Sequence, residues 1–382
     1  MASEWRIPFF DPDLGQAELE AVTRVIESKW LTMGQITAAF EGRFSEFVDC
    51  RYAVAVSSCT AALHIALRCL DIGPGDEVIC PAMTFVATAN AIRYCGAKPV
   101  FADVESLKHW NIGRCGIESV TTPRTKAILV VHYGGYPCDM PAIIELARSR
   151  GLSVVEDAAH AIGASLQGRA LGTWGDVGCF SFFSNKNMTT GEGGMLTTNR
   201  GDLAERARLL RSHGMTTVTL DRYKGHASAY DVVELGYNYR MGELNASLGL
   251  VQLGALKKRN AQRKEWVERY RRRLSSIPGL MLPFLCAGGE SAYHIMPILL
   301  PEGTDRARIM DALKADGVQT SIHFQPIDTF TSYREAGLGP CDHLIHTHQI
   351  GERVLTLPLY PSMRPEEVDY VCDALDGILR AS

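Results

Sequence analysis

The sequence predicts an α/β fold: a large, mostly parallel β-sheet with helices on both faces, followed by a smaller C-terminal α+β domain. Short apolar runs rich in Val and Ile alternate with helical patterns through the first two-thirds of the chain. These runs are continuous rather than alternating, which is typical of strands buried on both faces. The 382 residues are 46% hydrophobic and 21% charged, so the chain can form two domains with a core that needs no disulfides.

Seven strands are expected in the first domain, each bounded by turn or helix signals. They are Tyr52–Ser57, Glu77–Pro81, Pro99–Asp103, Ala127–His132, Ser153–Asp157, Gly178–Phe183 and Gly194–Thr198. Helical patterns lie between them. Apolar positions within Thr60–Leu70 follow the i, i+3, i+4, i+7 spacing of one helix face, and Met140–Arg150 and Asp202–His213 are similar. The succession of strands and helices favours a doubly wound sheet.

The pattern changes after Gly242, where one long helix is expected from Glu243 to about Arg273. The remainder mixes expected strands at His294–Leu300 and Gln319–Phe324 with expected helices at Asp305–Ala315 and Pro365–Leu379. We therefore place a domain boundary inside the long helix. The large domain takes residues 1–255 and the small domain residues 256–382.

Composition and charge exclude several classes of function. The net charge of −4 gives no reason to expect a nucleic-acid partner or a polybasic membrane anchor. Residues 1–15 lack the basic start and apolar run of a signal peptide, and the longest apolar run is too short to span a bilayer. The 11 cysteines include no C-x-x-C pair and no metal-ligand spacing, so we expect reduced thiols, a cytoplasmic location and no metal.

Candidate functional residues follow the strands, because ligands of α/β sheets collect at the carboxyl ends of the strands. Ser58, Cys59 and Thr60 open a helix, where free N–H groups and the positive end of the helix dipole favour phosphate. Asp157 ends a buried strand, and Lys186 lies in a polar loop after another strand. Taken singly, each has an ordinary interpretation as a helix cap, a turn cap or a solvated lysine.

Together these residues match the requirements of pyridoxal phosphate. That cofactor needs a lysine for a Schiff base, an acidic partner for its ring nitrogen, a flat side chain against the ring and donors for its phosphate. Lys186, Asp157, Phe85 and the Ser58–Thr60 turn with Ser181 could supply all four. The sequence contains no P-loop, no G-x-G-x-x-G after the first strand, no H-E-x-x-H and no G-x-S-x-G.

Nine segments, in order along the chain, carry a resemblance to a known family. They are FEGRFSEFV (40–48), SSCTAALHIAL (57–67), GPGDEVICPAMTFVATANAI (73–92), VVHYGGYPCDM (130–140), VVEDAAHAIGA (154–164), FSFFSNKNMTTGEGG (180–194), RSHGM (211–215), GYNYRMGELNASLGLVQL (236–253) and SIHFQP (321–326). With them the chain resembles the sugar aminotransferases named after DegT, DnrJ, EryC and StrS, within fold type I of the pyridoxal phosphate enzymes. The resemblance implies pyridoxal 5'-phosphate as cofactor, with pyridoxamine 5'-phosphate as the form that carries the amino group.

The resemblance also implies a role for each matching residue. Lys186 matches the lysine that forms the Schiff base and moves the proton, and Asp157 matches the partner of the ring nitrogen. Phe85 matches the aromatic residue that stacks on the ring, and Ser181 matches a phosphate ligand. His160 lies on the O3′ side of the cofactor, at a position where the family usually has Gln.

Other matches concern the phosphate, the partner subunit and the substrate. Cys59 and Thr60, next to Ser58, match phosphate donors, although the family more often has Gly at the position of Cys59. Asn238 matches a residue that reaches the phosphate from the neighbouring subunit, which implies a homodimer with shared active sites. The substrate-side matches are His323, Tyr239 and Arg240.

The resemblance implies that an amino group is transferred from L-glutamate to a keto sugar. SCTAAL (58–63) favours a nucleotide-linked 4-keto-6-deoxyhexose, because related 3-keto enzymes tend to carry Asp where this chain has Ala61. A ketocyclitol of the scyllo-inosose type or a 3-keto nucleotide sugar is an alternative substrate, since every cofactor residue would be shared. Sugar contacts are expected from the loops 184–190, 215–235 and 323–333.

Two further interpretations belong to other classes. A pyridoxal phosphate sugar dehydratase of the same fold replaces the Schiff-base lysine with His, whereas this chain keeps Lys186. A non-catalytic sensor of cofactor or sugar would need no intact pair of Lys186 and Asp157, and it would show no half-reaction with glutamate.

Overall fold

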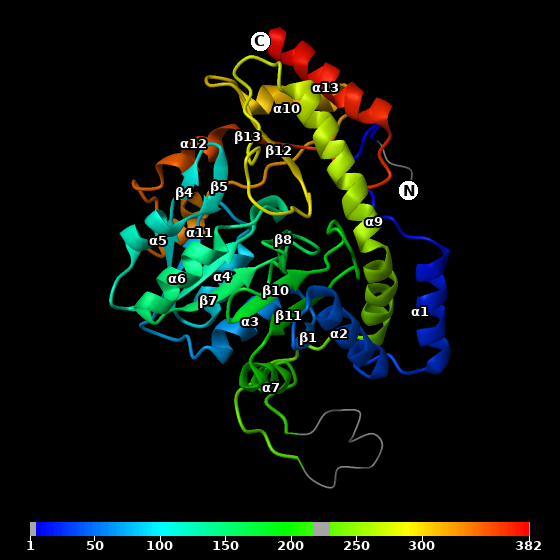
Figure 1. Ribbon diagram of the computed structural model, residues 1–382, viewed down its shortest axis with the longest axis vertical. Helices are drawn as coiled ribbons and strands as arrows, with labels where there is room; N and C mark the ends of the chain where they lie inside the picture. Colours follow the sequence, from blue (N-terminus) through cyan, green and yellow to red (C-terminus); the bar gives the residue numbers. More distant parts are fainter. Residues whose placement is uncertain (1–4, 217–229, 382) are drawn as a thin grey trace.

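The computed structural model describes residues 5–216 and 230–381. Its centre is a seven-stranded sheet with the order β1-β11-β10-β7-β6-β2-β3 (Figure 1). The pairs β10/β7, β7/β6, β6/β2 and β2/β3 are parallel, and β11 is antiparallel to both of its neighbours. The strands are β1 (Tyr52–Val56), β2 (Glu77–Pro81), β3 (Lys98–Ala102), β6 (Thr125–Val131), β7 (Ser153–Asp157), β10 (Val177–Ser181) and β11 (Gly194–Thr198). The predicted mostly parallel sheet is confirmed.

Helices cover both faces of this sheet, as the sequence predicts. Val54 of β1 packs in a cluster with α3 (Cys59–Cys69), whereas its neighbour Ala53 packs in another with α2 (Gln35–Val48). Alternate residues of a strand point to opposite faces, so both faces of β1 are buried. The other helices around the sheet are α4 (Ala87–Tyr94), α5 (Arg114–Val120), α6 (Met140–Arg150) and α7 (Gly201–Leu210).

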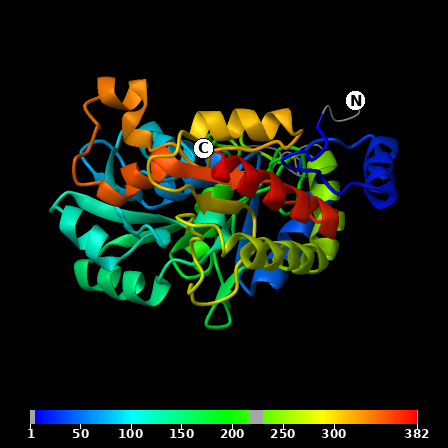
Figure 2. The same ribbon diagram turned by 90° about the horizontal axis from the view of Figure 1, so that it is seen from above.

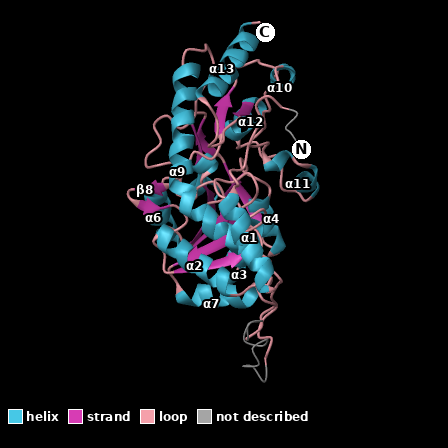
Figure 3. Ribbon diagram, turned by 90° about the vertical axis from the view of Figure 1, so that its right-hand side faces the viewer, coloured by secondary structure: helices cyan, strands magenta, loops and turns pink. Residues whose placement is uncertain are grey.

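The C-terminal part forms a smaller α+β unit at one end of the molecule. The long helix α9 (Glu243–Leu274) runs from the sheet into this unit (Figure 3), where its residues Trp266 and Tyr270 join the core. Ile7 joins the same core and bridges to Val318, so the N-terminal segment also packs there. The division after residue 255 stays our proposal.

Two strands and two helices complete the smaller unit. They are β12 (Met296–Leu299), β13 (Val354–Leu357), α10 (Arg306–Ala315) and α13 (Pro365–Arg380). The strands pair antiparallel, and α13 packs against both α9 and α10 (Figure 2).

Most expected elements are confirmed, with ends that shift by a few residues. The expected strand over Gln319–Phe324 is wrong: among the described residues this segment makes one bridge, between Ser321 and Thr356. Residues 322–325 have no strand partner and instead line a pocket. The partner of β12 is β13, which the sequence analysis did not identify.

The remaining elements are peripheral or short, and the sequence analysis did not identify them. Helix α1 (Gln16–Ser28) packs along α9. The others are β4 (Val104–Ser106), β5 (His109–Ile112), η1 (Tyr133–Gly135), β8 (Ser165–Leu166), β9 (Arg169–Ala170), η2 (Ile327–Thr329), α11 (Thr331–Glu335) and α12 (Ile345–Arg353). No helix in the described ranges combines the length and the apolar character that a membrane crossing requires.

After α7 the chain leaves the body of the molecule as a narrow extension (Figures 1 and 3). Met215 bridges to Val232, so the two described ends of this extension run antiparallel. Val232, Val233 and Leu235 expose large apolar side chains there. The expected sugar-contact loop 215–235 falls on this extension, and its residues 217–229 lie outside the described residues.

Candidate active site

A pocket of about 670 Å³ opens at the carboxyl edge of the central strands. Its wall comes from segments that follow β1, β2, β7 and β10, and from residues 322–325 next to the smaller unit. Nine of the residues predicted from the sequence line it: Ser58, Cys59, Thr60, Phe85, Asp157, His160, Ser181, Lys186 and His323. The fold therefore gathers residues that are far apart in the sequence.

Lys186 lies in the loop between β10 and β11. Its backbone N–H donates to the Phe183 carbonyl at 2.9 Å, which closes a turn at the pocket wall. Burial lowers the pKa of the Lys186 amine to about 8, although Cys59 and Asp157 oppose this shift. The neutral amine is the nucleophilic form, so Lys186 is suited to attack a carbonyl carbon near neutral pH.

Asp157 is the last residue of β7 and is 5% exposed. The Thr88 hydroxyl donates to its Oδ2 at 2.8 Å, and the Ala159 N–H donates to its Oδ1 at 3.1 Å. Burial raises the pKa of the Asp157 carboxyl, whereas these two hydrogen bonds and the charge of Lys186 lower it. The two donors hold the carboxylate in one orientation, in which it can keep a proton on a basic ring nitrogen of a ligand.

The turn after β1 leads into the N-terminus of α3. Ser58 Oγ accepts the N–H of Ala61 at 3.1 Å, so the ordinary interpretation of Ser58 as a helix cap is confirmed. A Cβ on Gly194 of β11 would lie 2.5 Å from the carbonyl carbon of Ser58, so this close approach requires glycine. The N-terminus of α3, Thr60 and Ser181 all line the pocket, and N–H and hydroxyl donors of this kind suit a phosphate.

These four features fit pyridoxal phosphate. A lysine with a lowered pKa, a buried carboxylate and a helix N-terminus with hydroxyls line one pocket. Phe85 adds an aromatic side chain that is 59% exposed in this chain and is available for a flat ring.

The two pocket histidines are neutral. His160 Nδ1 accepts the N–H of Gly134 at 3.3 Å, so its ring hydrogen is on Nε2. Burial lowers the pKa of His160 well below its usual value and that of His323 to about 3. His323 Nδ1 lies 3.1 Å from Thr356 Oγ1, and its ring stacks on Phe9 with centroids 5.6 Å apart. Neither residue therefore brings a positive charge to the pocket.

Three predicted residues lie outside this pocket. Asn238 bridges to Ser212, and Arg240 bridges to Val56 at the edge of the sheet. The Tyr239 hydroxyl lies 3.2 Å from His64 Nδ1, on α3. Asn238, Tyr239 and Arg240 are therefore not among the described residues of this chain that line the pocket.

The sequence analysis missed several residues that the pocket uses. Thr88 holds Asp157, and its hydroxyl also lies 3.0 Å from that of Thr84. Nothing in the sequence distinguishes this threonine from an ordinary helix residue. Three further wall residues, Asn185, Phe324 and Phe330, lie in the loops 184–190 and 323–333 from which sugar contacts are expected, whereas Phe183 had no predicted role.

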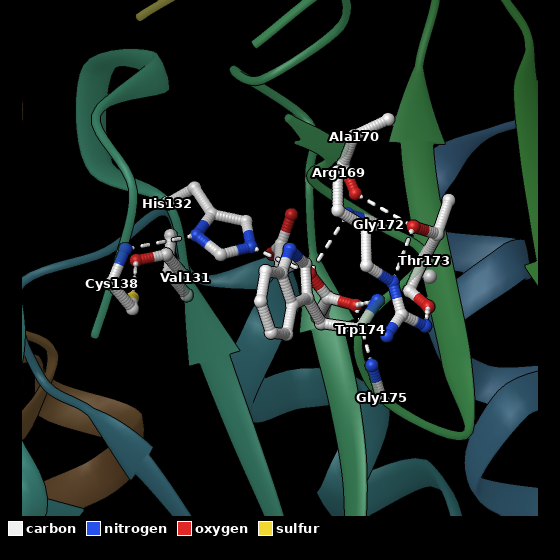
Figure 4. Close-up of polar contacts among 12 residues, drawn as sticks. Val131, His132, Cys138, Arg169, Ala170, Gly172, Thr173, Trp174 and Gly175 are labelled. Atoms are coloured by element: carbon white, nitrogen blue, oxygen red, sulfur yellow. Dashed lines mark hydrogen bonds and ion pairs between the residues drawn. The ribbon is translucent and has the colours of Figure 1, made fainter. Parts of the chain in front are cut away.

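A second buried carboxylate, Glu156, lies next to Asp157 in β7 but is outside the pocket. Its Oε1 accepts the N–H groups of Trp174 (2.6 Å) and Gly175 (2.7 Å), and its Oε2 accepts that of Gly172 (2.8 Å). His132 Nε2 donates to Oε2 at 3.0 Å, because its Nδ1 accepts the N–H of Cys138 at 3.2 Å. Figure 4 shows His132 and Cys138 on one side and the 172–175 turn on the other.

The fold and the pocket define the class of protein. A lysine and a buried carboxylate line one pocket at the carboxyl edge of a seven-stranded sheet, beside a helix N-terminus. This is the arrangement of a pyridoxal phosphate-dependent aminotransferase. The chain belongs to the DegT/DnrJ/EryC1/StrS aminotransferase family, whose profile matches residues 12–376.

Similar proteins agree with this assignment. The spore coat polysaccharide biosynthesis protein SpsC of Bacillus subtilis (strain 168) is 42% identical over 98% of each chain. The structure of the aminotransferase TlmJ from Streptoalloteichus hindustanus superposes with a TM-score of 0.90 at 38% identity, over 98% of this chain and 99% of that chain. Helicobacter pylori PseC, an aminotransferase involved in the biosynthesis of pseudoaminic acid, gives a TM-score of 0.90 at 27% identity, over 98% and 100%. The predicted family, fold and enzyme class are confirmed.

Proposed function

We propose that this sugar aminotransferase moves an amino group from L-glutamate to a nucleotide-linked 4-keto-6-deoxyhexose. The observation that carries the proposal is the pocket that joins Lys186, Asp157 and the N-terminus of α3. Family membership and similarity to a spore coat polysaccharide protein support a sugar as acceptor. The resemblance of the motifs supports glutamate as donor and position 4 as the keto carbon.

Each pocket residue then has a task. The bound cofactor supplies an aldehyde for the amine of Lys186 and a ring that withdraws electrons. Lys186 would bind the cofactor through its amine, and its free amine would take a proton from the substrate carbon or return one to it. Asp157 keeps the ring nitrogen protonated. Ser181 and Thr60, with the N–H groups of α3, would hold the phosphate, and Phe85 would supply an aromatic face for the ring.

The first test is the half-reaction with the donor. The purified protein, loaded with pyridoxal phosphate, is mixed with L-glutamate, and the cofactor absorbance and the 2-oxoglutarate formed are measured. The absorbance band of the lysine-bound cofactor should disappear as one 2-oxoglutarate forms for each site. Lys186→Ala should lose this reaction. A band that persists with glutamate would show that L-glutamate is not the amino donor. An absence of any band would favour a non-catalytic sensor.

The second test is the acceptor. The pyridoxamine form of the enzyme is offered a 4-keto nucleotide sugar, a 3-keto nucleotide sugar and a ketocyclitol, and the amino product is identified by mass spectrometry. Return of the lysine-bound band with the 4-keto sugar alone is expected. Conversion of only the ketocyclitol would show that a nucleotide sugar is not the amino acceptor.

We also propose a homodimer in which Asn238 of the partner subunit completes each site. The described residues that line the pocket include no arginine, although both proposed substrates are anionic and need cationic donors. Tyr237 and Tyr239 stack on each other with centroids 5.0 Å apart, so Asn238 and Arg240 lie on the opposite side of the segment, away from α3. The apolar extension around Val232 provides contact surface for a second copy.

Mixing two inactive variants tests this shared site. Lys186→Ala and Asn238→Ala dimers are dissociated, mixed and reassociated. If each site takes Asn238 from the other chain, one site of every hybrid is intact and activity returns. No return of activity in verified hybrids would place Asn238 in the site of its own chain.

A cytoplasmic location is part of the same proposal. All 11 cysteines are free thiols in the structure, which fits a reducing compartment. Fractionation of the native organism, with an antibody against the chain, checks this location.

A further inference from the structure

Asn187, next to Lys186, is tied to two distant segments by its side chain. It is 4% exposed, and its Nδ2 donates to the Ala292 carbonyl at 2.7 Å and to Asn260 Oδ1 of α9 at 2.8 Å. Its Oδ1 lies 2.8 Å from His294 Nδ1, just before β12. The lysine loop is therefore anchored to α9 and to the start of the smaller unit.

The direction of each hydrogen bond in this network is determined. The Ala292 carbonyl can only accept, so Asn187 Nδ2 must face it and Oδ1 must face His294. Asn260 Nδ2 donates to the Ile162 carbonyl at 3.0 Å, which leaves its Oδ1 to accept from Asn187. His294 Nδ1 must then carry a hydrogen. His294 is 4% exposed, and burial lowers its pKa well below the usual value, so the ring is neutral.

His294 is connected to His160 as well as to the lysine loop. The backbone N–H of His294 donates to the Gly134 carbonyl at 3.0 Å, and the N–H of Gly134 donates to His160 Nδ1 at 3.3 Å. The two imidazole rings pack together, with centroids 4.4 Å apart. One buried neutral histidine therefore contacts the residue beside Lys186 and the ring of His160.

We infer that His294 is a positioning residue, which fixes Lys186 through Asn187 and fixes the ring of His160 by direct packing. His294 lies outside the motifs of the sequence analysis, Asn187 lies inside FSFFSNKNMTTGEGG (180–194) with no role assigned to it, and neither side chain lines the pocket. The inference rests on the proposed role of Lys186. A displacement of about 1 Å at the lysine is enough to slow catalysis by about 10²-fold, so an anchor of this kind has a measurable effect on kcat.

Two substitutions separate the hydrogen bond from the ring. His294→Leu removes the ring Nδ1–H and leaves the buried Oδ1 of Asn187 without a donor. In His294→Asn, the side-chain amide can place an N–H near the position of the histidine Nδ1. We expect the kcat of His294→Leu to fall by about tenfold or more, with KM for glutamate changed by less than about threefold. We expect His294→Asn to recover most of the loss. His109→Leu, a histidine that pairs with Glu105 outside the pocket, is the matched control.

Two readouts do not depend on turnover. In the loaded protein, the pH midpoint of the absorbance of the lysine-bound cofactor should shift in His294→Leu and remain at the wild-type value in His109→Leu. In the cofactor-free protein, the losses of thermal stability in Asn187→Ala and His294→Leu should not add in the double variant, because both break the same bond. If His294→Leu does not fold, Asn187→Ala breaks the same hydrogen bond, and its pH midpoint and kcat can be measured instead.

Three results would overturn the inference: a wild-type pH midpoint and kcat in His294→Leu, additive stability losses in the double variant, or a His294→Asn variant as impaired as His294→Leu. Failure of the proposed function is distinguishable from these results. In that case the wild-type protein itself would form no band with pyridoxal phosphate or would keep its band with L-glutamate, whatever the variants at position 294 do.

Discussion

The two faces of strand β7 carry adjacent acidic residues with different surroundings. Glu156 is fully buried and its two oxygens accept four hydrogen bonds, three of them from backbone N–H groups of the 172–175 turn. Asp157 accepts two, from Thr88 and Ala159, and faces the pocket with Lys186. Glu156 has its acceptor capacity filled by the protein, whereas Asp157 keeps capacity for a ligand.

This difference separates a structural carboxylate from a functional one. Successive side chains of a strand point to opposite faces, so neighbours in sequence can serve separate purposes. We expect changes on the pocket face to alter catalysis with little loss of stability. We expect changes on the opposite face to lower stability with little effect on the catalysis of each folded molecule.

The largest effect is expected for Asp157→Asn. The amide keeps the shape and can still accept the Ala159 N–H, but it cannot hold a charged ring nitrogen. We expect kcat/KM for glutamate to fall by about 10²- to 10⁴-fold, with the free energy of unfolding changed by less than about 1 kcal/mol. Stopped-flow half-reactions and urea unfolding measure the two quantities. If Asp157→Asn lost several kcal/mol of unfolding free energy, Asp157 would be as structural as Glu156, and the proposed difference between the two carboxylates would be wrong.

The converse effect is expected for Glu156→Gln. The amide nitrogen would have to face N–H donors, either those of Trp174 and Gly175 or those of Gly172 and His132. We expect the free energy of unfolding of the cofactor-free protein to fall by about 3–5 kcal/mol, because a buried polar network loses an acceptor. Activity per folded molecule should stay within a few-fold of wild type. A stable variant with strongly reduced kcat would place Glu156 in the catalytic machinery.

A smaller effect is expected for Thr88→Val, which removes one of the two donors to Asp157. This hydrogen bond lowers the pKa of Asp157, so its loss should raise that pKa further. We expect the acid limb of the pH profile of kcat to move to higher pH, and kcat near that limb to fall by about tenfold. Thr88→Ser keeps the hydroxyl and should behave as wild type. An unchanged acid limb in Thr88→Val would argue against Asp157 as the titrating group.

The last expected effect, a pH dependence that comes from Lys186, is seen without a substitution. Its pKa in the folded protein is about 8, below the value of 10.5 for a solvent-exposed lysine, so the folded state binds fewer protons than the unfolded state between those two pH values. Lys186 should therefore add to the free energy of unfolding of the cofactor-free protein a contribution that rises between pH 8 and pH 10.5.

Capture of pyridoxal phosphate by the cofactor-free protein should depend on the same group. The rate should rise about tenfold per pH unit below pH 8 and level off above it, because only the neutral amine reacts. Lys186→Met should lose the rising stability contribution and form no lysine-bound band. A midpoint near 10.5 would show that burial does not shift this amine.

The sequence by itself determined the order of the elements and the main chemistry. Continuous apolar runs indicate buried strands wherever they occur, so the seven strands of the sheet could be predicted without knowledge of their neighbours. Lys186 and Asp157 could be proposed because each follows a strand, and the carboxyl ends of parallel strands meet at one edge. These signals are local in the chain.

The tertiary structure alone decided what depends on contacts between distant segments. A strand over Gln319–Phe324 was expected from its local pattern, but these residues border the pocket instead of a partner strand. The tautomer of His160 depends on Gly134, and the anchoring of Asn187 depends on His294. Hydrogen-bond partners of buried polar groups are chosen by packing, and a single sequence carries no signal for which distant donor meets which acceptor.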